Sequence, residues 1–285
     1  MATAGRPVDM ATLTHPELPI PTPPVTPVLQ FEHVSMAFGA EKVLEDVSFQ
    51  VSRGETKVLL GETNTGKTVL LKLALGLLRP TGGKIFVMGQ EVSALPEEVL
   101  FGLRREIGIV FQESALFDSM TVRENVAYRL VEEGEMDDQQ IEERVRTCLR
   151  FVELEATLDK MPDELSGGMR RRVSIARALA AEPDIMLYDS PTGGLDPVTA
   201  TTIMELIIKL RDVNKVTSLL VTHRLQDAYL MATHVWDAEK RALKPAPSSQ
   251  THTTFLLLRD RHIIFDGSAS ELQAQTDPYI KNYLS

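Results

Sequence analysis

The segment that most restricts how this chain can fold is Gly61–Thr68, which reads G-E-T-N-T-G-K-T. It matches the pattern G-x-x-x-x-G-K-[ST] of a phosphate-binding loop. The apolar run 56–60 before it predicts a buried strand, and the residues from Thr68 to about Gly76 predict a helix. Unpaired amides and the positive end of the helix dipole then face one point, which favours binding of an anion.

The residue types of this loop suit a nucleoside triphosphate with Mg²⁺. Lys67 can reach the β- and γ-phosphates, and the Thr68 hydroxyl can bind the metal. Asn64 stands where many such loops have Gly, and Asn tolerates left-handed backbone angles, so we expect the loop conformation to be kept. The candidate nucleotide-binding residues of the loop are Gly61, Glu62, Thr63, Asn64, Thr65, Gly66, Lys67 and Thr68.

Three further apolar runs each end in a polar side chain. They end at Gln112, Asp189 and His223. This pattern predicts an open parallel sheet whose ligand lies at the carboxyl ends of the strands. There Asp189 is expected to bind Mg²⁺ directly or indirectly, and His223 is expected to contact the γ-phosphate.

Taken in order, these segments resemble the ATP-binding subunit of ATP-binding cassette (ABC) transporters, from about residue 28 to the C-terminus. The remaining motifs of that family are a signature, L-S-G-G-M, which begins a helix, and a D-loop, G-L-D. The motifs lie at Gly61–Thr68 (Walker A), Gln112 (glutamine loop), Leu165–Met169 (signature), Ile185–Asp189 (Walker B), Gly194–Asp196 (D-loop) and His223 (switch histidine).

The resemblance implies an α/β fold with a P-loop NTPase (RecA-like) core, an antiparallel β subdomain and an α-helical subdomain over about 113–175. Two subunits, identical or different, would sandwich two ATP molecules, with Gln112 near the Mg²⁺. Phe38 matches the position that stacks on adenine, although its spacing is equally consistent with core packing. The signature and D-loop residues facing the partner's nucleotide would be Ser166, Gly167, Gly168 and Asp196.

Ser190 stands where this family usually has the Glu that orients the attacking water. A hydroxyl is a far weaker base near neutral pH. Three readings stay open: slow hydrolysis with Gln112 and His223 positioning water, pairing with an ATPase whose own site is complete, or ATP-dependent switching without turnover. We expect modest ATPase activity because the other motif positions are filled. Glu113 is either a displaced carboxylate or an exposed loop acid.

Segments 111–128 and 161–173 resemble MlaF-like ATPases, which serve MCE-associated lipid transport systems. This resemblance implies lipid cargo, an integral membrane permease of the MlaE type and an MCE-domain protein as a further partner. ATPases of small-solute importers share much of the pattern and remain an alternative, as does a non-hydrolysing regulatory cassette. A helix capped by Asp137 and Gln140, with an apolar stripe at 141, 145, 149 and 152, fits a segment that contacts such a membrane partner.

The composition limits partners and location. The net charge is −10 without a basic tract, which argues against nucleic acid. The clusters Arg170–Arg172 and Arg104–Arg105 are expected on solvated helix faces or beside phosphates. Cys148 is the one cysteine, which excludes an intrachain disulfide and fits a reducing cytoplasm. With no apolar run of membrane-spanning length and no secretion signal, we expect a cytoplasmic protein held at the inner or plasma membrane by the permease.

Outside the motifs, local composition suggests the domain organisation. Residues 1–27 are rich in proline and predict a disordered or extended tail, followed by the ABC ATPase domain over 28–285. Residues 28–51 predict antiparallel strands. The polar stretch 237–254 is expected to be an inserted flexible surface loop, followed over 255–285 by a hairpin turning at 259–261 and a helix that starts near Ser268.

Overall fold

The computed structural model describes residues 27–284, and an antiparallel sheet begins this described part. Its strands are β1 (Pro27–Phe38), β2 (Glu41–Ser52), β4 (Gly82–Val87) and β5 (Gln90–Glu91). They pair in the order β2-β1-β4-β5, which confirms the antiparallel strands expected over 28–51. Phe31 and Phe49 stack across β1 and β2 with ring centroids 4.6 Å apart, so one face of this sheet belongs to the core. The tail expected over 1–27 falls almost wholly outside the described residues.

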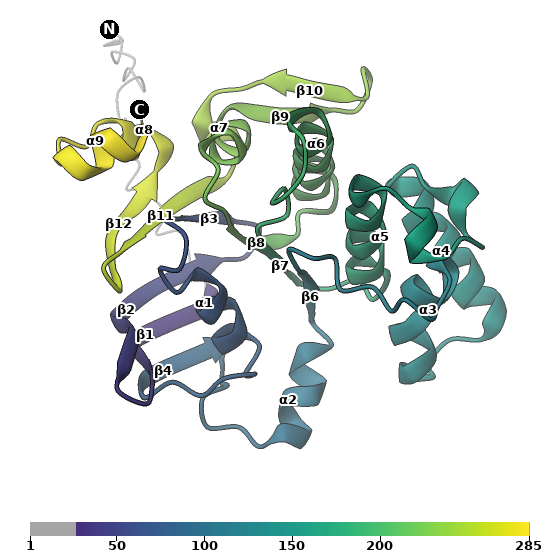
Figure 1. The fold of residues 1–285 in the computed structure, drawn as a ribbon, viewed down its shortest axis with the longest axis horizontal. Coiled ribbons are helices and arrows are strands. Elements are labelled where there is room, and N and C mark those ends of the chain that lie inside the picture. The colour runs from purple at the N-terminus through teal and green to yellow at the C-terminus, as the bar shows by residue number, and fades with distance from the viewer. Residues whose placement is uncertain (1–26, 285) are drawn as a thin grey trace, which may run out of the picture.

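A second sheet carries the motif strands. Its members are β3 (Thr56–Leu60), β6 (Ile107–Val110), β7 (Ile185–Asp189), β8 (Thr217–Val221), β11 (Thr253–Arg259) and β12 (His262–Ser268). The order is β12-β11-β3-β8-β7-β6, and all neighbours are parallel except β12 with β11. The expected parallel sheet is confirmed, and its strand ends meet at one edge (Figure 1).

This parallel sheet is covered on both faces. Val58 and Leu60 pack into one hydrophobic cluster, whereas Leu59 between them packs into the other. One cluster includes α5 (Gly167–Ala180), α6 (Pro197–Asn214) and α7 (Leu225–Thr233); the other includes α1 (Lys67–Ala74) and the antiparallel sheet. Burial on both faces explains why β3, β7 and β8 consist of continuous buried runs.

The helical subdomain lies to one side of β6, as Figure 1 shows. It contains α3 (Val122–Glu133), α4 (Asp138–Phe151), α5 and the short turns η1 (Glu155–Thr157) and η2 (Pro162–Glu164). A separate helix, α2 (Glu97–Arg104), comes directly before β6. Asp137 caps α4 by accepting from the Gln140 amide, and the Gln140 side chain accepts from the Asp137 amide, as expected. Cys148 is buried in this subdomain, and burial raises the pKa of its thiol.

The stretch 237–254 differs from the flexible loop that the sequence suggested. β9 (His234–Asp237) and β10 (Ala242–Pro245) pair as an antiparallel hairpin, and the short turn η3 (Ser248–Gln250) follows. The hairpin is fixed to α6, because the Trp236 amide donates to Asp212 Oδ2 at 2.7 Å and Arg211 Nη2 donates to the His234 oxygen at 2.7 Å. These bonds come from a distant helix, which explains why the polar local composition misled the prediction.

The C-terminal elements extend the parallel sheet. The expected hairpin is present as β11 and β12, but β11 also pairs in parallel with β3, so it belongs to the core sheet. The helix expected near Ser268 is α8 (Ala269–Gln273), which Ser268 caps in a capping box with Glu271. The last element of the described part is α9 (Pro278–Leu284), which lies beside α8 (Figure 1).

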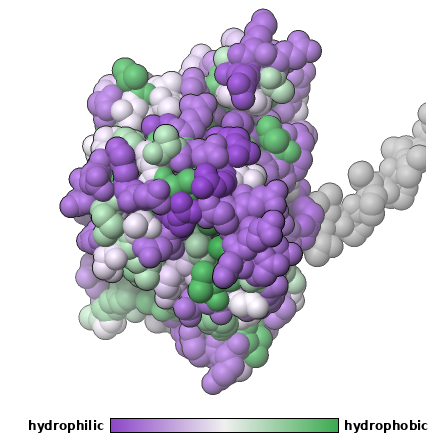
Figure 2. Space-filling view, turned by 90° about the vertical axis from the view of Figure 1, so that its right-hand side faces the viewer, coloured by the Kyte–Doolittle hydropathy of each residue, from purple (hydrophilic) through white to green (hydrophobic). Residues whose placement is uncertain are grey.

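The surface on the side of the helical subdomain is mainly hydrophilic, with small separate hydrophobic patches (Figure 2). Large apolar side chains with the greatest exposure include Phe101 at 65% and Val198 at 78%. Among residues 27–284, no helix is both long enough and apolar enough to traverse a bilayer.

Candidate nucleotide-binding site

The loop 61–66 leaves the carboxyl end of β3 and leads directly into α1. Its first glycine is required by close packing, because a Cβ on Gly61 would lie 2.6 Å from the Leu258 oxygen of β11. Gly66 ends the loop with a left-handed φ of 98°. Asn64 is also left-handed, with a φ of 63°, as expected of the residue that replaces glycine.

Lys67 folds back over this loop. Its Nζ donates to the Gly61 oxygen at 2.9 Å and also to the Glu62 oxygen. The side chain is buried, and burial lowers the pKa of Lys67, while the charges of Asp189 and Glu62 act in the opposite direction. The loop therefore encloses a poorly hydrated cation, which interacts more strongly with a phosphate than a hydrated one does.

Thr68 and Asp189, the two residues expected to bind Mg²⁺, bring their side-chain oxygens together. Thr68 Oγ1 donates to Asp189 Oδ1 at 3.1 Å, at the tip of β7. Adjacent oxygen ligands of octahedral Mg²⁺ lie about 3 Å apart, so this pair fits the ion. Residues 27–284 contain no cluster of three or more His, Cys, Asp or Glu able to hold a metal. Burial raises the pKa of Asp189, opposed by the Thr68 bond and Lys67.

Ser190 occupies a constrained turn directly after Asp189. It is 7% exposed and has a left-handed φ of 46°. Its amide donates to the Val221 oxygen at 2.8 Å, and its oxygen accepts from the Gly193 amide at 2.9 Å. The backbone of the usual glutamate position is thus firmly placed, but it carries a neutral hydroxyl.

Arg171 does not lie on a solvated helix face, one of the two positions expected for its cluster. It is only 4% exposed, and it donates to the backbone oxygens of Gln112 and Ser190. Burial lowers the pKa of Arg171. A signal was present in the sequence: residue 171 falls on the same helical face as Gly168, Ile175 and Ala178, all of which are buried.

Asp227 is a second residue that the motifs did not reveal. It is 2% exposed and accepts hydrogen bonds from Thr192 Oγ1 at 2.5 Å and Thr222 Oγ1 at 2.8 Å. It thereby ties the segment before His223 to the segment after β7, and burial raises its pKa. The residues around Asp227 in the sequence are the same as would surround an exposed acid in the first turn of a helix, so its burial could not be predicted from them. His223 itself is exposed, and its role stays a prediction.

Gln112 and Glu113 lie at the tip of β6. A Cβ on Gly193 would lie 3.3 Å from Gln112 Cδ, so this side chain is next to the segment that follows β7. Glu113 is exposed. Its charge acts to raise the pKa of Arg171, so Glu113 lies near the guanidinium that contacts Gln112 and Ser190. A carboxylate is therefore present in the neighbourhood, although Glu113 is the exposed loop acid that the sequence suggested.

The signature forms a separate surface of the same chain. Ser166 is exposed and caps α5 by accepting from the Met169 amide at 3.2 Å. Asp196 is exposed and caps α6, accepting from the amides of Val198 and Thr199 at 3.1 Å. Between residues 27 and 284, no hydrogen bond joins Ser166, Gly167, Gly168 or Asp196 to the phosphate loop.

Phe38 is available to a ligand. It ends β1 and is 49% exposed, so the alternative of core packing is wrong. The following strand reaches the phosphate loop, because a Cβ on Gly66 would lie 3.0 Å from Val43 Cγ1 and Leu44 Cδ2.

These features together define a P-loop nucleotide-binding cassette: an amide-lined loop with a buried lysine, a carboxylate at the neighbouring strand tip and a capped signature helix. The chain belongs to the ABC transporter family, whose profile matches residues 44–193. It is an ATP-binding ATPase subunit of the MlaF-like type.

Two relatives match nearly the whole chain. The chloroplastic protein TRIGALACTOSYLDIACYLGLYCEROL 3 of Arabidopsis thaliana is 36% identical over 90% of this chain and 73% of its own length. The intermembrane phospholipid transport system ATP-binding protein MlaF of Escherichia coli is 33% identical over 91% of this chain and 89% of its own length.

Solved structures agree on the fold. A dimeric ATP-binding cassette in a post-hydrolysis state, bound to ADP and Pi, is 29% identical and covers 84% of this chain and 98% of its own, with a TM-score of 0.71. The structure of cbiO1 from Clostridium perfringens, part of an ABC transporter complex, is 25% identical over 90% of this chain and 95% of its own, with a TM-score of 0.74.

Proposed function

We propose that this ATPase drives lipid transport through a membrane permease, and that it acts as a dimer with ATP and Mg²⁺ between its subunits. The observation that carries the proposal is the set of enclosed phosphate-binding groups in a chain similar to MlaF over 91% of its length. MlaF is described as part of a phospholipid transport system. We extend that cargo class to this chain.

Each part of the loop has a role in this proposal. The loop amides and Lys67 hold the β- and γ-phosphates, while Thr68 and Asp189 hold Mg²⁺, with Gln112 nearby. The metal neutralises charge on the phosphates during transfer to water. His223 contacts the γ-phosphate, and Phe38 stacks on the adenine.

A dimer would complete the site. Ser166 and Asp196 are exposed at two helix N-termini, and the chain makes no hydrogen bond from them to its own loop within the described region. A helix N-terminus offers amides and a positive dipole end to an anion. The signature of one subunit would therefore close over the triphosphate bound by the other. The dimeric cassette bound to ADP and Pi supports this arrangement.

Turnover would be slow because of Ser190. Without a carboxylate at that position, water is oriented by Gln112 and His223 alone, and the phosphate itself must accept the proton. General-base assistance typically contributes about 10²- to 10⁴-fold, so its loss permits modest turnover.

A groove between the helical subdomain and the core suits the permease. It encloses about 560 Å³ and combines exposed aromatic side chains with arginines. Phe101 is 65% exposed and Phe117 is 41% exposed, and the Arg177 guanidinium lies 5.8 Å from the centre of the Phe117 ring. An amphipathic helix from a cytoplasmic loop of the permease would place apolar side chains on these rings. This contact would hold the ATPase at the membrane.

The cargo has one serious alternative. The probable ribonucleotide transport ATP-binding protein mkl of Mycobacterium tuberculosis is 32% identical over 90% of this chain, although this chain spans only 66% of it. That relative favours a polar solute. An MCE-domain partner would favour lipid, and a solute-binding protein would favour the polar alternative.

The test is purification of the chain with its permease, followed by identification of bound lipid and measurement of phosphate release. We expect lipid in the complex and phosphate release above that of a Lys67→Ala blank. Phe101→Ser with Phe117→Ser should abolish co-purification, whereas Val213→Ser, at an exposed residue of α6, should not. A complex that carries a polar solute and no lipid would contradict the cargo, and phosphate release equal to the blank would contradict turnover.

A further inference from the structure

The C-terminal helix α9 contacts the first two residues of the phosphate loop. The Gly61 amide donates to the Tyr283 hydroxyl at 3.1 Å. The Tyr279 hydroxyl donates to Glu62 Oε1 at 3.0 Å. Tyr279 and Tyr283 are four residues apart on a helix, so one face of α9 presents both hydroxyls to the loop.

The two tyrosines are themselves held in place. The Arg259 guanidinium of β11 lies 3.9 Å from the centre of the Tyr279 ring, and the rings of Tyr279 and Tyr283 stack with centroids 6.1 Å apart. Ile280, on the same helix, is 2% exposed and belongs to the core. Because α9 is anchored at both the sheet and the core, its hydroxyls form a fixed support for the loop.

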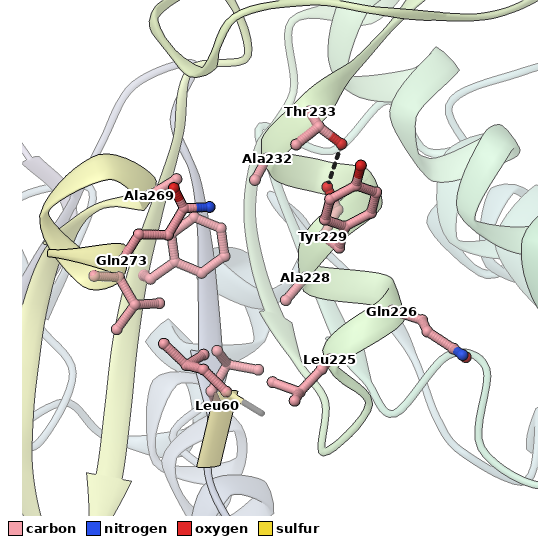
Figure 3. A pocket seen from close by; sticks show the side chains of 12 residues that line it. Leu60, Leu225, Gln226, Ala228, Tyr229, Ala232, Thr233, Ala269 and Gln273 are labelled. Carbon is pink, nitrogen blue, oxygen red and sulfur yellow. Dashed lines mark hydrogen bonds between the residues drawn. The ribbon is translucent and has the colours of Figure 1, made fainter. Parts of the chain in front are cut away.

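A pocket lies on the α7 side of these contacts. A cavity of about 390 Å³ separates α7 from the C-terminal elements (Figure 3). Leu60, directly before the loop, lines this cavity together with Leu225 and Ala228 of α7, and Leu284 of α9 lines it too. Leu60 is itself buried, so β3 is fixed up to the start of the loop, and the directional bonds from α9 act on the two residues that follow.

The same two loop residues also hold the lysine. Lys67 Nζ donates to the backbone oxygens of Gly61 and Glu62. A shift of either residue would displace the ammonium group. In addition, Glu62 carries a negative charge beside the place for a triphosphate, and its carboxylate is bound by Tyr279.

We propose that Tyr279 and Tyr283 are positioning residues for ATP. In this proposal α9 holds Gly61 and Glu62 in place, so the Lys67 ammonium group keeps its position over the loop and the Glu62 carboxylate stays bound to the helix. Neither tyrosine touches the nucleotide. This inference rests on ATP binding at the phosphate loop.

The experiment compares Tyr279→Phe, Tyr283→Phe and the double variant in the full-length chain. Tyr229→Phe is the matched control, since Tyr229 is exposed on α7. A fluorescent ATP analogue with Mg²⁺ gives Kd, steady-state phosphate release gives KM and kcat, and amide exchange reports on residues 61–62. We expect Kd and KM to rise about two- to tenfold in the double variant, the range of one net hydrogen bond. Exchange at 61–62 should accelerate while kcat changes less.

Unchanged Kd and KM in the double variant would overturn the inference. So would a rise that Tyr229→Phe reproduces, or one without faster exchange at 61–62. If the double variant does not fold, Tyr283→Phe alone must raise Kd at least about twofold, and an unchanged value overturns the inference. Lys67→Ala tests separately whether ATP binds at the phosphate loop. Normal ATP binding by this variant would reject the loop as the ATP site. Lost binding would support the loop as the site, and the tyrosine variants then test the role of α9.

Discussion

Arg171 Nη1 donates a hydrogen bond to the backbone oxygen of Ser190 over 3.1 Å. A second nitrogen of the same guanidinium donates to the Gln112 oxygen. Arg171 lies in the first turns of the signature helix, so one buried side chain connects that helix to two strand tips of the nucleotide site. A movement of the signature helix would therefore be passed through a direct contact to the backbone of Ser190 and Gln112.

Replacing Arg171 tests this connection. Arg171→Met removes the donor of the Gln112 oxygen and one of the two donors of the Ser190 oxygen, and we expect the free energy of unfolding to fall by about 1–3 kcal/mol. Phosphate release should fall as well. Denaturant unfolding and an ATPase assay measure both. Arg53→Met is the control, because Arg53 makes an exposed ion pair with Asp184 and should change stability by less than about 1 kcal/mol. Equal effects of the two variants would refute a special role for Arg171.

Ser190→Glu should raise turnover. A carboxylate at this position can accept a proton from water, and we expect kcat to increase at least about tenfold. The gain will be smaller than the full effect of a general base, because residue 190 is left-handed and a longer side chain must fit a buried turn. Ser190→Gln has the same shape without the charge and should not raise kcat. The idea fails if the Gln variant is as fast as the Glu variant.

Asp189→Asn should separate stability from activity. Burial raises the pKa of Asp189 above its ordinary 3.8, so the folded chain binds this proton more tightly than the unfolded chain does. The stability linked to that proton is present below pH 3.8 and is lost as pH rises through the raised pKa. At pH 7 without nucleotide or metal, we therefore expect the Asn variant to have a Tm at least equal to that of the parent.

The same Asp189→Asn variant loses a charged group beside the Mg²⁺ position. We expect Mg²⁺-dependent phosphate release to fall about 10- to 100-fold. Thermal melts between pH 4 and 8 should show its advantage in Tm shrinking toward low pH, where Asp189 becomes protonated. A Tm well below that of the parent at pH 7 would show that the Thr68 and Lys67 interactions outweigh burial.

Gly168→Ala should disturb the contact between α5 and α6. A Cβ at residue 168 would lie 2.3 Å from Thr199 Cγ2, and such overpacking costs about 1–3 kcal/mol. Thr199→Ser removes the clashing methyl group, so the double variant should recover most of the loss in unfolding free energy. Strictly additive effects in this double-mutant cycle would contradict the proposed clash.

Much of the fold follows from local pattern. The phosphate loop predicts its own strand and helix, and the polar ends of Gln112, Asp189 and His223 predict a shared sheet edge. The capping box at Asp137 is likewise a local hydrogen-bond pattern, and the structure contains it. Such features depend on residues a few positions apart, so the sequence alone is sufficient to predict them.

Contacts between distant segments were not predictable in this way. The β9–β10 hairpin is fixed by Asp212 and Arg211 of α6, and its polar composition resembles that of a loop. Arg171 was expected on a solvated helix face or beside a phosphate, although its place on a face with buried residues indicated burial. Phe38 was ambiguous until its exposure of 49% decided against the core.

Short motifs are sufficient to predict that this chain folds around a phosphate loop and resembles the ABC ATPases, because amide geometry, the lysine and the strand ends are local features. The groups that support that loop come from distant parts of the chain. The Gly61–Tyr283 bond joins residues 222 positions apart. No local propensity encodes such a contact, because it depends on β11 pairing with β3 and on α9 packing back against the sheet.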